Sequence, residues 1–287
     1  MIQEIGSIEN YKLKMWEVRL PCQTRDFVNH KHVAFEIAYI VSGSGLYTTQ
    51  THVHEMNAGD FFVFSSNEIH KITKIAEGGM TLINLHIEPE LLFGRSMDSL
   101  SAENRNFCFQ HSLEFSNHIT ASNASKLKDI FMIIKSELEN RQEEYSLLTK
   151  SLLNILLITL IRDYNYTTRS GANPKHAKAL QTALKYINTH ITERLTLEKV
   201  AQIAHITPNY FSALFHDFFN IRFQDYINTQ RIDLAKRYLT DSNSDLTILD
   251  IAAHCGFNNS ANFNKAFRKH TGLTPNEYRS MQDSLIQ

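Results

Sequence analysis

Cysteine is scarce in this chain, and the few thiols lie far apart. Only three occur in 287 residues, Cys22, Cys108 and Cys255, and none has the spacing of a metal-binding motif. An odd number of distant cysteines does not form the disulfide framework of a small secreted domain. We therefore expect buried or spare thiols in a protein of the reducing cytoplasm.

Long hydrophobic runs and an export signal are missing as well. The longest apolar stretch, residues 151–161, is interrupted by Asn154 and Thr159, and it is well short of the roughly 20 residues that span a bilayer. Residues 1–6 contain neither a basic segment nor an apolar core, so they do not resemble a signal peptide. The sequence predicts a cytoplasmic protein with no membrane segment.

The net charge is only −1 at pH 7, but the charges are unevenly distributed. From Lys175 onward there are 13 Lys/Arg against 10 Asp/Glu, whereas residues 1–174 contain 16 against 20. Because cationic side chains attract phosphate, this polarity has the sign expected if only the C-terminal part contacts nucleic acid. A chain of this length also permits two globular domains with separate cores.

The first 120 residues alternate short β-prone runs with turn signals. Residues 35–41, 46–51 and 61–64 are rich in β-branched and aromatic side chains, and Gly, Ser, Asn and Asp separate them. This pattern predicts an antiparallel β-barrel. The period then becomes helical over residues 126–139 and 147–164, so we expect a helical hairpin after the barrel.

The second of these helices is apolar on nearly every side, and such a helix must be covered on more than one face. It either lies between the barrel and its neighbouring helix or packs against its twin in a homodimer, the commonest oligomer of soluble proteins. Residues 165–174 are polar and lack periodicity, which is typical of a linker. We predict an α+β protein with an effector-binding and dimerisation domain at 1–164 and an all-helical domain at 175–287.

The last ninety residues contain one pattern twice. The segment 195–201 returns as 246–252, and Phe211 and Phe215 recur as Phe263 and Phe267. Two copies at this period indicate a duplicated structural unit. Each copy has the pattern of two short helices joined by a turn. Residues 223–239 predict a continuous helix between the copies, and at 1.5 Å per residue this helix spans about 25 Å.

In each copy the second helix has an apolar stripe and a polar face. A polar face of this kind can lie in a DNA major groove and reach the base edges. The connecting helix would hold the two faces near the roughly 34 Å repeat of successive major grooves, so one chain would contact a bipartite site. The candidate DNA-binding residues are Asn209, Ser212, Ala213 and His216 in the first copy and Ser260, Ala261, Asn264, Lys265 and Arg268 in the second.

The segments 231–239, 248–257 and 263–279 resemble the DNA-binding domain of the AraC/XylS family of bacterial transcription regulators. The resemblance covers about 175–280 and implies two helix-turn-helix motifs in adjacent major grooves. It further implies a homodimer and an activator of carbohydrate-utilisation genes, with RNA polymerase as a partner. The first copy departs from the family, because Ala213 replaces a frequent arginine and His205 and Asn220 replace glycines. Both replacements tolerate positive φ, so we expect the turns to persist.

A second resemblance lies in the N-terminal domain. His30, His32, Glu36 and Gly43 match the first motif of cupin barrels, HxH(x)3E(x)6G, and residues 59–70 resemble the second. In cupin enzymes the first three, with a histidine matching His70, bind a divalent metal, and their strand parity places them on one side of a sheet. AraC-family regulators commonly keep this pattern around a metal-free pocket, so we predict no cofactor. The candidate effector-binding residues, with a sugar as the family's commonest effector class, are Trp16, His30, His32, Glu36, Tyr39 and His70.

Two other functions stay open. A metal-dependent cupin enzyme with an accessory helical domain would contain stoichiometric metal and turn over a substrate. A DNA-binding protein without an effector would bind DNA with an affinity that no sugar changes. The sequence favours a ligand-responsive regulator that is not an enzyme, because the duplicated helical unit, the connecting helix and the ordered motif occur together.

Overall fold

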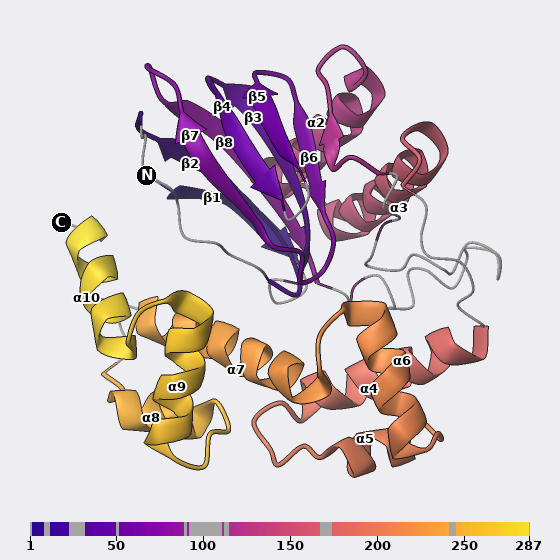
Figure 1. The fold of residues 1–287 in the computed structure, drawn as a ribbon, viewed down its shortest axis with the longest axis vertical. Coiled ribbons are helices and arrows are strands. Elements are labelled where there is room, and N and C mark those ends of the chain that lie inside the picture. The colour runs from indigo at the N-terminus through magenta and orange to yellow at the C-terminus, as the bar shows by residue number, and fades with distance from the viewer. Residues whose placement is uncertain are drawn as a thin grey trace. The chain divides into compact units, whose positions relative to one another are not determined.

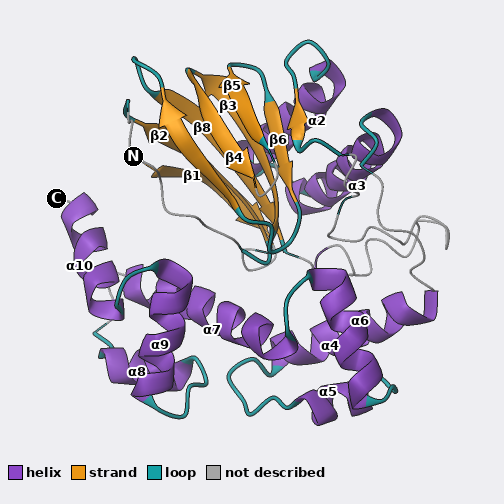
Figure 2. Ribbon diagram, viewed as in Figure 1, coloured by secondary structure: helices purple, strands orange, loops and turns teal. Residues whose placement is uncertain are grey.

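A computed structural model of the chain describes residues 2–8, 12–22, 32–49, 52–88, 91, 111, 115–166, 174–240 and 245–286. For residues 174–177 and 281–286 it describes the backbone alone. The chain divides into two compact units, which consist mainly of residues 1–177 and 178–287. The first contains strands and two long helices, and the second contains helices (Figure 1, Figure 2). The α+β fold class is therefore confirmed, while the boundary at 165–174 stays a prediction because residues 167–173 lie outside the described part.

The first unit contains two antiparallel sheets. The larger has the strand order β1-β2-β8-β3-β6-β9 and the smaller the order β5-β4-β7. Strands thus occur where the sequence predicted an antiparallel β region, although the closure of a cupin barrel stays a prediction. The strands are β1 (Ile2–Ile8), β2 (Leu13–Leu20), β3 (Phe35–Ser42), β4 (Ser44–Thr49), β5 (Val53–Asn57), β6 (Phe61–Phe64), β7 (His70–Ile75), β8 (Met80–Ile87) and β9 (His118–Ile119).

Strand β3 is buried on both faces, which explains why its sequence is apolar at nearly every position. On one face Ala38 and Ile40 belong to a core that also contains Tyr47 of the smaller sheet. On the other face Tyr39 packs near Phe131 of the helix that covers the larger sheet, with ring centroids 5.9 Å apart. The side chains of β3 therefore separate into two sets, and a residue's parity decides which set it joins.

Helices α2 (Ser125–Asn140) and α3 (Tyr145–Asp163) form the predicted hairpin and pack against each other. Seven residues of α3 are buried, but Leu147, Leu148 and Ile155 are 44–60% exposed. The described residues therefore do not cover this helix on all sides. By length and composition alone α3 is apolar enough to cross a membrane, and core helices of soluble proteins meet the same criteria.

The second unit contains the two predicted copies of a short helix, a turn and a second helix. Thr196 accepts a hydrogen bond from the backbone N–H of Lys199 and caps the first copy, and Thr247 and Asp250 form a capping box at the start of the second. Each cap satisfies N–H groups that would otherwise lack a partner. The helices are α4 (Pro174–Thr189), α5 (Leu197–Ile203), α6 (Pro208–Phe219), α7 (Phe223–Thr240), α8 (Ile248–His254), α9 (Ser260–Thr271) and α10 (Pro275–Ile286).

The turns within the copies require left-handed backbone conformations. Gly256 has φ +82° after α8, whereas His205 has φ +57° after α5 and Asn220 has φ +49° after α6. The prediction that histidine and asparagine replace glycine without loss of these turns is confirmed. Histidine and asparagine are among the non-glycine residues that adopt this conformation most often.

One buried arginine joins the two copies. Arg231 of α7 is 8% exposed. Its Nε donates a hydrogen bond to the carbonyl oxygen of Ile191 at 2.8 Å, and its Nη2 donates one to that of Glu193 at 2.6 Å. The guanidinium also lies 5.8 Å from the ring centre of Phe257 in the turn of the second copy. The loop before α5 and the turn before α9 are therefore held against the same point of α7.

Candidate functional site

The exposed face of α6 contains all four candidate residues of the first copy. Asn209, Ser212, Ala213 and His216 are exposed, while the alternate face of the helix is buried. The buried set anchors the helix through aromatic contacts, such as Phe211 against Phe215 with ring centroids 5.5 Å apart. A helix anchored in this way presents its polar face rigidly.

The exposed face of α9 has the same arrangement in the second copy. Asn259 caps the helix by accepting a hydrogen bond from the backbone N–H of Asn262. Phe263, Ala266 and Phe267 are buried. The five candidate residues of this copy, Ser260, Ala261, Asn264, Lys265 and Arg268, are all exposed.

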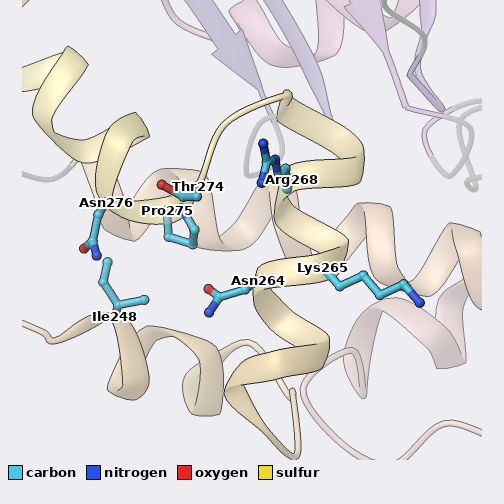
Figure 3. A pocket seen from close by; sticks show the side chains of 7 residues that line it. All are labelled: Ile248, Asn264, Lys265, Arg268, Thr274, Pro275 and Asn276. Atoms are coloured by element: carbon cyan, nitrogen blue, oxygen red, sulfur yellow. The ribbon is translucent and has the colours of Figure 1, made fainter.

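The polar face of α9 borders a hollow of about 430 Å³ (Figure 3). Asn264, Lys265 and Arg268 line it from α9. Sequence reasoning missed the rest of its lining, because residues of α8 and α10 come beside α9 only in the folded domain. These further residues are Ile248, Thr274, Pro275 and Asn276.

Lys269 is less suited to DNA than its neighbour Arg268. Its Nζ lies 2.7 Å from Oδ1 of Asp225 on α7, so its charge is shared with a carboxylate. Arg268 belongs to the lining of the hollow. A phosphate contact by Arg268 stays a prediction.

A cluster of histidines surrounds Glu36 in the first unit. Glu36 is 1% exposed, and its Oε2 lies 2.5 Å from Nε2 of His32, 2.7 Å from Nε2 of His86 and 3.6 Å from Nε2 of His70. The structure therefore brings three of the predicted effector-binding residues together, His32, Glu36 and His70. His30 lies outside the described residues.

Sequence reasoning missed His86. It lies in β8, directly opposite Glu36 in the antiparallel register of β3 and β8. The local sequence shows only a histidine between Leu85 and Ile87, and strand pairing cannot be deduced from such a signal. Trp16 from β2 packs edge-on against the His86 ring with centroids 4.5 Å apart, so this predicted residue does border the cluster.

Tyr39 does not border the cluster, and this part of the sequence prediction needs correction. It lies three residues after Glu36 in the same strand, and an odd separation places two side chains on opposite faces. Tyr39 instead packs against Phe61, with ring centroids 4.6 Å apart, beneath α2. Its role is in the sheet–helix core.

Burial and neighbouring groups shift the pKa values of Glu36 and His86. Burial raises the pKa of Glu36, but the charge of His86 and hydrogen bonds from His32, His70 and His86 lower it well below its usual range. Burial, followed by the neighbouring His32, lowers the pKa of His86 to about 3. At neutral pH the cluster therefore contains a carboxylate beside a neutral His86 imidazole.

Among the described residues, His32, Glu36 and His86 have donor atoms within 4.8 Å of one another. They are the group that could contact one ion. The cupin resemblance implied His30, His32, Glu36 and His70 for this role; His30 lies outside the described residues, and the structure adds His86 beside His32 and Glu36.

Comparison with known protein families identifies both domains. A family of AraC-like ligand-binding domains matches residues 20–157, and a family of helix-turn-helix domains matches residues 200–281. The second match includes α6, α7, α8 and α9, which present the two polar faces described above.

Named relatives agree with these matches. The regulatory protein PocR of Salmonella typhimurium is 39% identical over 115 residues, 40% of this chain and 37% of PocR. An HTH-type transcriptional regulator of Staphylococcus aureus is 25% identical over 254 residues, 88% of this chain and 32% of that protein. The chain thus spans about a third of the length of these relatives. These two relatives are named as regulators, which gives no support to the enzyme alternative.

The fold is also similar to that of a solved structure. ToxT from Vibrio cholerae superposes with a TM-score of 0.62 over 94% of this chain and 98% of ToxT, at 16% identity. At this identity the likeness extends to the fold alone. The two family matches carry the assignment, and the chain belongs to the AraC/XylS family of transcription regulators, with an AraC-like ligand-binding domain followed by a helix-turn-helix domain.

Proposed function

We propose that the chain is a ligand-responsive regulator that binds a bipartite DNA sequence through α6 and α9. The observation that carries the proposal is the presence of two exposed polar helix faces, each anchored by a buried aromatic stripe. Helix α7 has 18 residues, about 27 Å at 1.5 Å per residue. This length supports a spacing near one turn of B-form DNA.

The effector site of this proposal is the Glu36 cluster. His32, Glu36, His70 and His86 offer polar groups there, and Trp16 supplies an apolar wall. A few convergent polar groups beside an aromatic ring suit a small polyhydroxylated molecule such as a sugar. The effector must bind one arrangement of the protein more tightly than another, since otherwise nothing is switched.

Family membership supports the remaining parts of the proposal. The regulator acts in the cytoplasm, activates carbohydrate-utilisation genes and contacts RNA polymerase while bound to DNA. The test is selection of bound duplexes from random sequence at stated salt, with and without a panel of sugars. A bipartite consensus whose affinity changes with one sugar is the expected result. Salt-insensitive or absent duplex binding would refute the proposal.

Two adjacent turns of α9 should contribute differently to binding. We expect Lys265→Ala to relax base preference in one half of the site, at a cost of about 1–3 kcal/mol against the preferred base. Arg268→Ala should weaken all duplexes alike and reduce the salt dependence by about one unit, because it contacts phosphate. Titration of preferred and scrambled duplexes by fluorescence anisotropy distinguishes these effects.

The matched control is Lys185→Ala, which removes an exposed cation from α4. It should leave the ratio of the two affinities unchanged. If Lys265→Ala and Arg268→Ala lower the affinity for both duplexes by equal factors, the assignment of a base contact to Lys265 is wrong.

A homodimer through residues 126–164 is also part of the proposal. Leu147, Leu148 and Ile155 leave apolar surface exposed on α3, and burying such surface is favourable by about 25 cal/mol per Å². We expect wild-type protein to sediment as a dimer and Ile155→Glu to shift it toward monomer at micromolar concentration. Lys150→Glu, on the same helix, is the charge control. A wild-type monomer across the accessible concentrations would contradict this part of the proposal.

A further inference from the structure

Both ring nitrogens of His32 face oxygen atoms that act as hydrogen-bond acceptors. Nδ1 lies 2.8 Å from the carbonyl oxygen of Ala34, and Nε2 lies 2.5 Å from Oε2 of Glu36. A neutral imidazole has a single N–H. The ring can donate to both oxygens only as an imidazolium, whereas in the neutral ring one nitrogen presents its lone pair to an oxygen, which a bound cation would relieve.

His70 has the same arrangement. Its Nδ1 lies 2.9 Å from the carbonyl oxygen of Glu68, and a carbonyl oxygen only accepts, so Nδ1 carries an N–H. Its Nε2 faces Oε2 of Glu36, 3.6 Å away. Histidines that bind metals commonly donate one N–H to a backbone carbonyl, because this bond sets the tautomer and directs the other nitrogen at the ion.

The carboxylate itself has an unused oxygen. Oε1 of Glu36 is buried and has no hydrogen-bond partner among the residues that the structure describes. A buried acceptor without a partner costs about 1–3 kcal/mol, and more when it is charged. A cation held by the carboxylate would remove that cost.

We propose that Nε2 of His32, Nε2 of His86 and the carboxylate of Glu36 bind one divalent transition-metal ion. Their donor atoms lie within 4.8 Å of one another, and Nε2 of His70 lies 3.6 Å from the same carboxylate oxygen. Imidazoles with one carboxylate suit Zn²⁺, Co²⁺ or Ni²⁺ better than Mg²⁺ or Ca²⁺. Ligand bonds of about 2.0–2.1 Å place tetrahedral donors about 3.3 Å apart. The side chains must therefore separate by roughly 1 Å or less.

An ion can reach this site from solvent. The side chains of His32 and His86 are 19% and 11% exposed, whereas that of Glu36 is 1% exposed. The carboxylate therefore lies at the base of the cluster with the buried His70, and the imidazoles of His32 and His86 lie at its outer side. This proposal replaces the expectation of a metal-free pocket. The metal site does not depend on DNA binding. The metal proposal can therefore hold even if the regulator proposal fails.

Titration of the full, tag-free, metal-stripped chain tests the site. Calorimetry with Zn²⁺ and with Co²⁺ should give one ion per chain. Co²⁺ should also quench the fluorescence of Trp16, the single tryptophan, because its ring lies 4.5 Å from that of His86. Absence of saturable binding would overturn the proposal.

Variants then locate the ion. We expect His86→Ala and Glu36→Gln to weaken Zn²⁺ binding at least hundredfold, more than loss of a residue that only orients a ligand. His54→Ala, which removes a histidine from β5 of the same unit, should leave the affinity unchanged. Equal affinities in all three variants, or an equal loss in His54→Ala, would refute the assigned ligands.

X-ray absorption of the Zn²⁺-loaded wild type identifies the ligand atoms without any substitution. It therefore tests the proposal even if a variant does not fold. The spectrum should show imidazole scattering with nitrogen neighbours at about 2.0–2.1 Å. A shell of oxygen atoms without imidazole would overturn the proposal irrespective of how the variants behave.

Discussion

Replacing Arg231 by alanine should lower the free energy of unfolding of the helical unit by about 3 kcal/mol. The guanidinium is buried and donates to two carbonyl oxygens, those of Ile191 and Glu193. Its removal leaves both acceptors without this donor and opens a cavity beside Phe257. Hydrogen exchange of the amides in α7 and α9, read by mass spectrometry, should accelerate roughly a hundredfold where opening of the unit controls exchange.

The effect should extend to DNA affinity, because Arg231 holds the loop before α5 and the turn before α9 against one helix. Arg231→Lys tests the geometry, since lysine keeps the charge but cannot reproduce the forked donors of arginine. We expect it to recover only part of the lost stability. Arg237→Ala removes an exposed cation from the same helix and should change stability by less than about 0.5 kcal/mol. Comparable losses of unfolding free energy for Arg231→Ala and Arg237→Ala would show that the buried contacts of Arg231 contribute little to stability.

Gly43→Ala should destabilise the β-rich unit by about 4 kcal/mol or more. Gly43 has φ +89°, and a Cβ atom there would lie 2.2 Å from the carbonyl oxygen of Gly79 and 2.8 Å from Cα of Met80. Both neighbours are backbone atoms of the turn into β8, so they cannot rotate away. The cost therefore combines left-handed strain with displacement of a strand end. Urea unfolding followed by Trp16 fluorescence reports on this unit, because Trp16 is the only tryptophan.

Gly78→Ala separates the two contributions. Gly78 has φ +93°, similar to that of Gly43, but a Cβ atom there meets nothing within 4 Å. Gly78→Ala should lower the free energy of unfolding by only about 1–2 kcal/mol, the cost of a left-handed conformation for alanine. The difference between the variants measures the backbone clash. Equal losses would mean that the close approach of Gly43 to Gly79 has no energetic weight.

Gly43 and Arg231 show which parts of a residue's role can be predicted from the sequence and which cannot. The spacing of Gly43 after Glu36 belongs to a recognisable motif, whereas its contact with Gly79 depends on how the two sheets fold. Arg231 belongs to the segment that resembles a DNA-binding domain, yet its partners lie in a loop about forty residues earlier. Local patterns mark such residues, and long-range contacts give them their physical role.

The chain's own periodicity determined the helical unit. A repeat of about fifty residues and apolar stripes at helical spacing are local features. They predicted both polar faces correctly, since an apolar stripe that must be buried dictates which side of a helix remains exposed.

Tertiary structure decided the composition of the Glu36 cluster. Strand parity is local, and it shows why Tyr39 faces away from Glu36. The presence of His86 instead follows from the pairing of β3 with β8, fifty residues apart. Strand register results from the burial of whole sheet faces and from turn geometry, so no short motif encodes which side chain comes to lie opposite Glu36.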